Sequence, residues 1–296
     1  MANNEGVNQI LPLIRTANAL LGPVAPGACA AVAERLFTSP RRYTPPAREA
    51  VAERRGERIT LGEGRSGLRW AARDTGSERP AKILAMHGWE GRATQWGPLA
   101  ELANAAGLEV LAIDGPGHGH SPGSRADLAS FARALFDADR RHGPFTAVVG
   151  HSMGAGTLGY ALAGGLRAER AVLIAGPSSI AGVLRRFSGF VGLPGTVERR
   201  FFDRMEARVG IPAESLDVAE FSVQLPTLIV HSRDDRDVPF AEAEAIAGAW
   251  PRAELLALDG LGHRRILRDP EVLAAVVGFL ADGPGRAAQA SSAQTA

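Results

Sequence analysis

The sequence predicts an α/β fold in which a mostly parallel central sheet is flanked by helices and carries a small helical lid. From Arg58 onward, short apolar runs alternate with longer helical patterns, which is typical of βαβ units. This alternation stops between residues 177 and 225, where we expect the lid. The chain has 296 residues, of which 45% are hydrophobic and 22% charged. These values are typical of a globular protein with a sizeable core.

The first 57 residues are expected to form a helical arm. Apolar side chains recur at approximately helical spacing over residues 7–21, and a second short helix is plausible at 28–37. Prolines at 40, 45 and 46 then interrupt the helical pattern. The arm either packs on the main domain or serves a homodimer. Cys29 is the sole cysteine, so no intrachain disulfide forms, and its run of small residues favours a buried hydrophobe.

The main domain is expected to span residues 58–281, followed by a flexible tail at 282–296 with little to bury. Residues 58–62 and 68–73 are expected to add an antiparallel hairpin at the leading edge. The expected strands are Lys82 to Met86, Leu108 to Ile113, Phe145 to Val149, Arg170 to Ala175, Thr227 to Val230 and Glu254 to Leu258. The expected helices lie near 94–106, 125–141, 153–163, 240–249 and 270–281.

The lid contains an amphipathic helix, because Val197, Phe201, Met205 and Val209 fall four residues apart with charged residues between them. Its aromatic side chains are candidates for substrate contact, and the alternative is that they only attach the lid to the core. These candidates are Phe187, Phe190, Phe201 and Phe202.

Charge and hydropathy exclude several classes of partner. A formal net charge of +1 gives no broad field for nucleic acid or an anionic membrane, so we expect a small, largely uncharged ligand. The apolar run from Ile10 to Ala33 has no Lys or Arg before Arg15 and is broken by Pro23 and Pro26, which argues against an export signal. No segment approaches the roughly 18 uncharged apolar residues of a membrane span. A cytoplasmic location is expected.

One segment carries a nucleophile motif. A buried strand from Phe145 runs into Gly150-His151-Ser152-Met153-Gly154, and a helix pattern follows. A serine on a sharp turn between strand and helix presents its hydroxyl above the sheet, and the two glycines leave room for that turn. The start of the helix favours developing negative charge. Ser152 is therefore the predicted nucleophile.

Acyl transfer to a serine also needs backbone N–H donors for the oxyanion. We expect one from Met153, which follows the nucleophile, and a second from Trp89 in the loop Met86-His87-Gly88-Trp89-Glu90-Gly91. This His-Gly motif, the segment from Asp114 to Gly119 and the serine motif resemble the α/β-hydrolase superfamily over roughly residues 58–281. The resemblance implies the α/β-hydrolase fold and a catalytic triad. His87 and His151, which adjoin these motifs, are expected to contact the substrate.

The resemblance also implies which histidine is the base, because the triad of this superfamily follows the chain order serine, acid, histidine. Of the seven histidines, four precede the serine, His151 adjoins it, and His231 comes before the candidate acids. His263 follows an acid and lies in a loop beyond the last strand, so it is the predicted base.

For the acid, the resemblance implies an aspartate three residues before Val-Pro, after the seventh strand. The segment from Ser232 to Pro239 places Asp235 there, with Asp234 and Asp237 as alternatives. Ser232 departs from the glycine often found at its position. Some relatives place the acid after the sixth strand, but residues 176–179 contain no carboxylate.

No cofactor or metal is expected. The glycine-rich stretch from Asp114 to Gly123 lacks the pattern of a phosphate-binding loop. His118 and His120 with Asp114 have no second group of ligands at zinc spacing.

The sequence thus predicts a serine hydrolase that cleaves carboxylic esters of small to medium apolar substrates through an acyl-enzyme. Three alternatives use the same triad: an acyltransferase, a thioesterase and a hydrolase of carbon–carbon bonds. A ligand-binding protein that keeps the fold without turnover is the alternative outside catalysis. Ser152 argues against a dehalogenase or an epoxide hydrolase, which would use aspartate as nucleophile.

Overall fold

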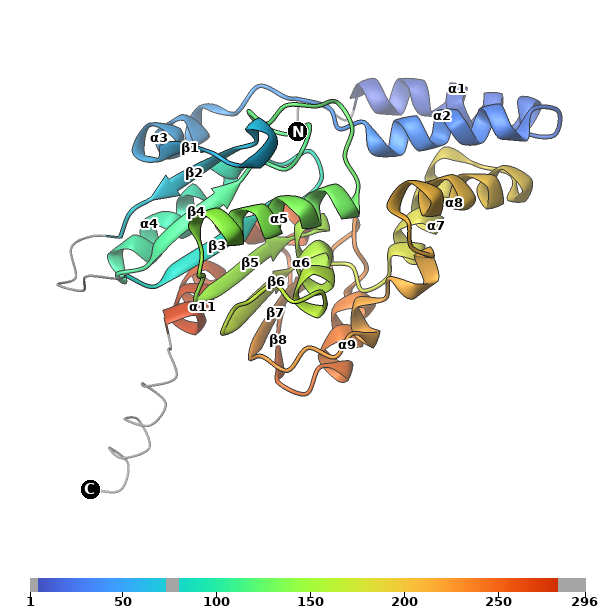
Figure 1. Cartoon of the computed structure of the whole chain (residues 1–296). Helices are drawn as coiled ribbons and strands as arrows, with labels where there is room; N and C mark the ends of the chain where they lie inside the picture. Colours follow the sequence, from blue (N-terminus) through green and yellow to red (C-terminus); the bar gives the residue numbers. More distant parts are fainter. Residues whose placement is uncertain (1–4, 73–79, 282–296) are drawn as a thin grey trace, which may run out of the picture. The chain divides into compact units, whose positions relative to one another are not determined.

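A computed structural model describes residues 5–72 and 80–281, and the predicted tail at 282–296 lies outside the described residues. The described chain divides into two compact units (Figure 1). One is helical and comprises the residues up to Pro40 together with Ser179–Asp217. The other begins at Arg41, includes residues up to Ser178, and resumes at Val218. Residues 41–57 of the predicted arm therefore belong to the second unit, where α3 (Ala47–Arg55) contacts α4 (Gly97–Ala105).

The larger unit is built on a sheet of eight strands in the order β1-β2-β4-β3-β5-β6-β7-β8. The strands β3 to β8 are parallel, and the two leading strands form the antiparallel edge. The mostly parallel α/β sheet predicted from the sequence is confirmed. The strands are β1 (Glu57–Thr60), β2 (Ser66–Trp70), β3 (Lys82–Met86), β4 (Glu109–Ile113), β5 (Ala147–His151), β6 (Arg170–Ile174), β7 (Thr227–Ser232) and β8 (Ala253–Leu258).

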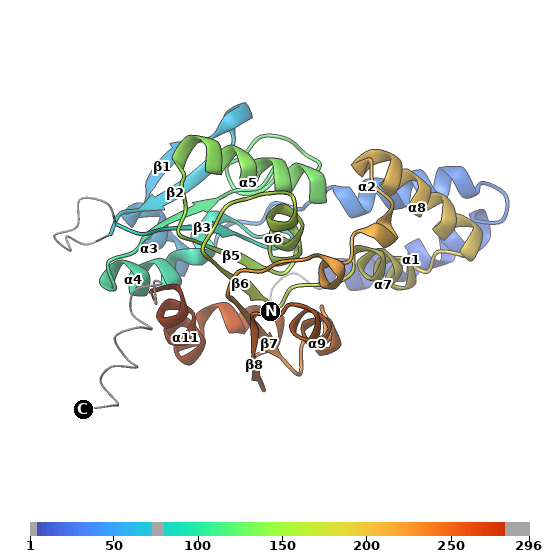
Figure 2. The ribbon, with the colours of Figure 1, turned by 60° about the horizontal axis from the view of Figure 1, so that its bottom comes forward.

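Helices cover both faces of this sheet (Figure 2). On one face, α4 and α11 (Pro270–Ala281) pack against alternate residues of the central strands. On the other face lie α5 (Leu128–His142), α6 (Met153–Ala163) and α9 (Phe240–Ala249). Because both faces are covered, the central strands are buried along nearly their whole length, which explains their continuous apolar runs. The remaining helical segments are η1 (Gly62–Gly64), η2 (Ala93–Trp96), η4 (Val218–Glu220), α10 (Gly262–Arg265) and η5 (Ile266–Arg268).

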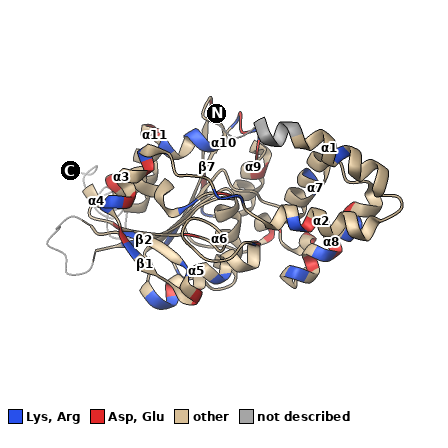
Figure 3. Ribbon diagram, turned by 90° about the horizontal axis from the view of Figure 1, so that it is seen from above, with Lys and Arg blue, Asp and Glu red and all other residues tan. Residues whose placement is uncertain are grey.

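The helical unit joins two stretches that are distant in sequence. Its elements are α1 (Glu5–Leu21), α2 (Pro26–Thr38), α7 (Ile180–Val191), α8 (Gly195–Val209) and η3 (Ala213–Ser215). Phe201 and Met205 on α8 are buried with Cys29 and Ala33 on α2. At the edge of this core the Arg204 guanidinium donates to Glu34 over 2.7 Å, and both signs of charge alternate along α8 (Figure 3). The N-terminal helix α2 and the segment after β6 thus share one core.

Among the described residues, no helix is both long enough and apolar enough to cross a lipid bilayer.

Candidate active site

Ser152 lies on a sharp turn between β5 and α6. Its φ of 53° and ψ of −122° are unusual for a residue with a side chain, and such strain persists only where the surroundings enforce it. The Ser152 N–H donates to the Ile174 carbonyl of β6 over 2.9 Å. A Cβ on Gly154 would come within 2.4 Å of the Met86 carbonyl oxygen, and one on Gly150 within 2.7 Å of the Gly154 backbone. The turn therefore requires both glycines that the sequence motif contains.

Ser152, His263 and Asp235, the three residues singled out in the sequence, form one hydrogen-bonded chain. The Ser152 Oγ lies 2.9 Å from His263 Nε2, and His263 Nδ1 lies 2.7 Å from Asp235 Oδ2. The serine and histidine are 111 positions apart in the chain, so the fold alone brings them together. In this arrangement Nδ1–H donates to the carboxylate and leaves Nε2 to accept from the serine hydroxyl.

The Asp235 carboxylate is buried and accepts from three donors. Its Oδ1 accepts from the backbone N–H groups of Asp237 at 2.8 Å and Val238 at 2.9 Å, while Oδ2 faces His263. Burial acts to raise the pKa of Asp235, but the histidine and the two amides outweigh it and hold the pKa below its usual range. Asp235 is therefore an anion held in one orientation beside His263.

The two alternative acids, Asp234 and Asp237, do not contact the His263 ring through their side chains in the hydrogen bonds described above. Asp237 is exposed and contributes only its backbone N–H to the cluster. Asp234 is also exposed, and its Oδ1 accepts from the Gly262 N–H over 3.2 Å.

Ser232 occupies a position where the α/β-hydrolase pattern favours glycine. Its side chain has a structural role that the sequence analysis did not predict. Its Oγ donates to Asp234 and accepts from the N–H groups of Leu261 at 3.2 Å and Gly262 at 3.1 Å. Ser232 and Asp234 thus hold the loop that carries His263. A short polar side chain at the end of β7 was the available signal in the sequence.

Met153 and the loop containing Trp89, the two predicted sources of oxyanion donors, both adjoin Ser152. Met153 is the first residue of α6, where backbone N–H groups have no partner within the helix. On the other side, a Cβ on Gly88 would lie 2.8 Å from the Ser152 Cβ, so the loop containing Trp89 packs directly against the serine. The Trp89 ring meets the His118 ring edge to face, with centroids 5.2 Å apart.

His87 and His151 serve as internal supports, which differs from the predicted contact with substrate. His87 Nδ1–H donates to the Gly88 carbonyl over 2.7 Å, and its Nε2 accepts from the Gly115 N–H over 2.9 Å. Both ring nitrogens are therefore engaged inside the protein. His151 Nε2 lies 2.8 Å from the His263 carbonyl oxygen. Burial lowers the pKa of His87 to about 4 and that of His151 to about 3, so both are neutral near pH 7.

Of the four aromatic residues predicted to contact the substrate, Phe201 needs correction. The Phe201 ring is fully buried in the core of the helical unit, 5.7 Å from Phe37 and 5.5 Å from Phe187 between centroids. Phe202 packs edge to face on Phe201. Phe190 alone of the four is exposed, at 49%. Spacing of four residues along a helix predicts a buried stripe, and here that stripe packs on α2.

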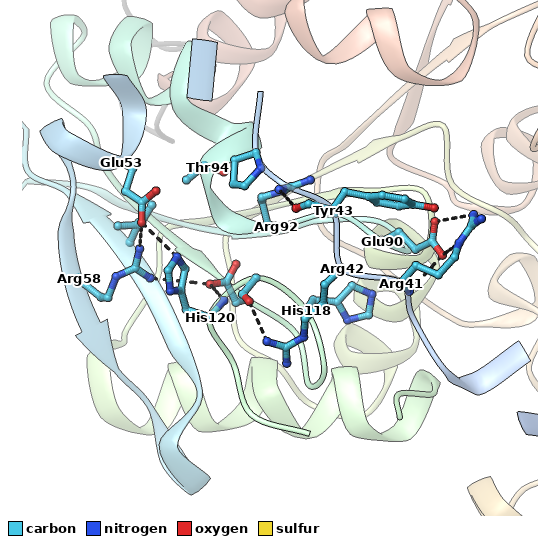
Figure 4. Close-up of a pocket in the computed structure, with 15 residues that line it drawn as sticks. Arg41, Arg42, Tyr43, Glu53, Arg58, Glu90, Arg92, Thr94, His118 and His120 are labelled. Carbon is cyan, nitrogen blue, oxygen red and sulfur yellow. Dashed lines mark hydrogen bonds and ion pairs between the residues drawn. The ribbon is translucent and has the colours of Figure 1, made fainter. Parts of the chain in front are cut away.

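Within the larger unit, a cavity of about 200 Å³ lies beside the loops after β3 and β4 (Figure 4). The residues around it include Arg41, Arg42, Glu90, Asp114 and His120 but none of Ser152, Asp235 and His263. Its charged groups already have partners: Arg41 pairs with Glu90 and Arg58 with Glu53, while the Arg42 guanidinium donates to backbone carbonyls. Asp114 accepts from the N–H groups of Ala93 and His120 at 2.7 and 3.0 Å, which connects the loops after β3 and β4. Among the described residues no three His, Cys, Asp or Glu side chains are grouped to hold a metal ion.

Known proteins resemble this chain in sequence and in fold. A model of the alpha/beta hydrolase family matches residues 83–276. A serine hydrolase-like protein of Dictyostelium discoideum is 32% identical over 107 residues, a match that covers 34% of this chain and 30% of that protein.

Solved structures of esterases share the fold. An esterase of Pyrococcus furiosus superposes with a TM-score of 0.59 at 21% identity, covering 82% of this chain and 98% of its own. Est1E of Butyrivibrio proteoclasticus, solved with ferulic acid bound, has a TM-score of 0.59 at 19% identity, covering 76% of this chain and 97% of its own. At these identities the likeness concerns the fold. Because the family model covers more than half of the sequence, the chain belongs to the alpha/beta hydrolase family.

Proposed function

We propose that this protein is a serine hydrolase that cleaves carboxylic esters of small to medium apolar substrates through an acyl-enzyme. The observation that carries the proposal is the chain Ser152 Oγ to His263 Nε2 to Asp235 Oδ2, with contacts of 2.9 and 2.7 Å. It lies at a strained turn that presents the serine at the carboxyl end of β5. Esterases among the structures with this fold support the choice of esters.

In the first step, the Ser152 oxygen attacks the ester carbonyl carbon while His263 Nε2 takes the hydroxyl proton. The carbonyl oxygen becomes an oxyanion, and the backbone N–H groups of Met153 and Trp89 donate to it. The carbon–oxygen bond to the alcohol then breaks, and His263 returns the proton to the departing alcohol. Asp235 holds the imidazole in the tautomer that can accept the proton and stabilises the imidazolium.

In the second step, water attacks the acyl-enzyme and gives its proton to His263 Nε2. Collapse of the new oxyanion breaks the bond to the Ser152 oxygen, which recovers the proton, and the carboxylic acid leaves. The two halves use the same groups in the same positions.

The test combines labelling with turnover. A fluorophosphonate should label Ser152 in the wild-type protein, and Ser152→Ala should abolish both labelling and hydrolysis of p-nitrophenyl esters with an unchanged melting temperature. Ser222→Ala, at an exposed serine, is the matched control and should keep both. Labelling at another residue, or full activity of Ser152→Ala, would overturn the proposal.

Product identification separates the alternatives that share the triad. Esters, thioesters and activated acyl donors would be offered with and without an alcohol acceptor. The proposal predicts release of free acid from esters at a rate that the acceptor does not change. Faster turnover of thioesters, or an acylated acceptor as the main product, would overturn the assignment to ester hydrolysis. Labelling of Ser152 without turnover would favour a binding protein.

A further inference from the structure

The loop after β3 contains a turn with an unfavourable residue at one position. The Gly91 N–H donates to the Gly88 carbonyl over 2.9 Å, which closes a four-residue turn with Trp89 and Glu90 in the middle. Glu90 has a φ of 57°. The third position of such a turn favours glycine, because a side chain destabilises the left-handed backbone. A glutamate at this position needs contacts elsewhere that hold it.

Arg41 provides those contacts through its side chain and its backbone. The guanidinium is bidentate, with Nε 2.7 Å from Glu90 Oε1 and Nη2 3.0 Å from Oε2. The Arg41 backbone N–H also donates to Oε1 over 3.2 Å. Figure 4 shows the two side chains facing each other beside Tyr43. Paired planar groups fix both distance and orientation.

The pair differs from an ordinary surface salt bridge. The Glu90 side chain is only 11% exposed, whereas that of Arg41 is 51% exposed. Burial acts to raise the pKa of Glu90, but Arg41 outweighs it and keeps the pKa below its usual range. The carboxylate therefore stays charged at neutral pH, and its orientation is set mainly by Arg41, with a further hydrogen bond from Tyr43.

The first residue of this turn, Gly88, lies directly against Ser152. The Gly88 backbone packs so closely on Ser152 that a Cβ on Gly88 would lie 2.8 Å from the Ser152 Cβ. Trp89 follows Gly88 in the chain and precedes Glu90. The His87 contact with the Gly88 carbonyl anchors the start of the turn. The Arg41 contact anchors Glu90 on its far side. The direction of the Trp89 amide depends on both anchors.

We propose that Arg41 is a positioning residue for the reaction. By clamping Glu90 in its left-handed conformation, it holds the Trp89 N–H toward the oxyanion that forms at Ser152. The inference rests on the proposed function, because the oxyanion exists only if Ser152 attacks a carbonyl.

The neighbouring residues allow the clamp to be removed without unfolding the segment. The Arg42 guanidinium donates to the carbonyls of Gly117 at 3.1 Å and Ser121 at 2.6 Å, and Arg92 donates to the Tyr43 carbonyl over 2.8 Å. These contacts remain when the Arg41 side chain is truncated. Since that side chain is half exposed, its loss leaves no buried cavity.

The first experiment measures kcat and KM for a p-nitrophenyl ester together with the melting temperature. Loss of a whole oxyanion donor costs roughly 100- to 1000-fold in kcat. Arg41→Ala misplaces the donor without removing it, so we expect kcat to fall about 10- to 100-fold, with KM nearly unchanged. The melting temperature should fall as well, because the mostly buried Glu90 carboxylate loses its charged partner. Arg41→Lys, which lacks the two-point geometry, should recover part of the loss. Arg55→Ala removes an exposed pair with Glu101 and is the matched control.

A second pair of variants tests whether the left-handed backbone conformation of Glu90 affects activity. Glu90→Gly lowers the cost of the left-handed conformation, so it should retain more activity than Glu90→Ala, which keeps that cost and loses the clamp. In the Glu90→Gly background, Arg41→Ala should have little further effect, because no carboxylate remains to be held. A general structural role for Arg41 would lower kcat equally in both backgrounds.

The inference is overturned if wild type is active and labelled at Ser152 but Arg41→Ala has the wild-type kcat. It is equally overturned if the loss appears as a lower melting temperature alone, or persists in the Glu90→Gly background. Absence of labelling and turnover in the wild-type protein would instead refute the proposed function.

Discussion

Replacing Asp235 by asparagine keeps the shape of the side chain and removes its charge. In the wild-type protein Oδ1 accepts from two backbone N–H groups, of Asp237 and Val238, and Oδ2 accepts from His263. The asparagine amide has one acceptor oxygen and one NH₂ group. Its oxygen must face the two backbone donors, because the opposite orientation would set donors against donors in a site where the carboxylate is wholly buried.

The NH₂ group of the variant then points at His263 Nδ1. That nitrogen has to accept, so the imidazole proton moves to Nε2, where it faces the serine hydroxyl and prevents proton transfer. A loss of about 10⁴ in kcat accompanies this change of tautomer in the best-known serine triad, which corresponds to about 5 kcal/mol. The same magnitude is expected here, since the hydrogen bonds that impose the tautomer are all present.

Steady-state kinetics with a p-nitrophenyl ester would measure the loss, with the melting temperature as a check on folding. Asp237→Asn is the matched control, because its side chain is exposed and its backbone N–H survives the change. If Asp235→Asn keeps more than about a tenth of the wild-type kcat, the tautomer argument fails. If Asp237→Asn is the more damaging variant, Asp237 is the acid.

Three further predictions concern stability and the turn. His87, His118 and His151 are buried and their pKa values lie at about 4, 3 and 3. The unfolded chain therefore binds more protons below pH 6.5, and the free energy of unfolding from urea titrations should fall by up to about 1.4 kcal/mol per pH unit for each histidine as the pH drops. A constant value between pH 7 and 5 would refute this. Phe201→Ala should destabilise the helical unit by about 3–5 kcal/mol in chemical unfolding, because a fully buried ring is lost, and an unchanged stability with altered preference for acyl length would restore its role in substrate contact. Gly154→Ala should abolish turnover, because its Cβ would lie 2.4 Å from a carbonyl oxygen of β3; wild-type kinetics would show that the turn adapts.

Local sequence patterns predicted most of the strands of the larger unit. Parallel strands buried on both faces show continuous apolar runs, and those runs predicted β3 to β8 to within a few residues at each end. The nucleophile turn was also readable, because glycine spacing and the change from strand to helix are local features. Chain order and family resemblance then singled out His263 and Asp235, which the fold places within hydrogen-bonding distance of each other.

These local patterns could not predict contacts between segments that are distant in the sequence. The apolar stripe around Phe201 predicts burial but not its partner, so only the tertiary structure showed that α8 packs on α2. The two ring nitrogens of His87 likewise look available in the sequence, and the loops after β3 and β4 engage both. Arg41 carries no motif at all. Its contact with Glu90 spans 49 positions and depends on a left-handed turn, and neither can be read from residue types alone. The sequence by itself determined which groups are candidates for the proposed chemistry, because that chemistry needs particular residue types at particular turns. The tertiary structure decided which neighbours hold those groups in place, because hydrogen-bond partners are set by distances in space.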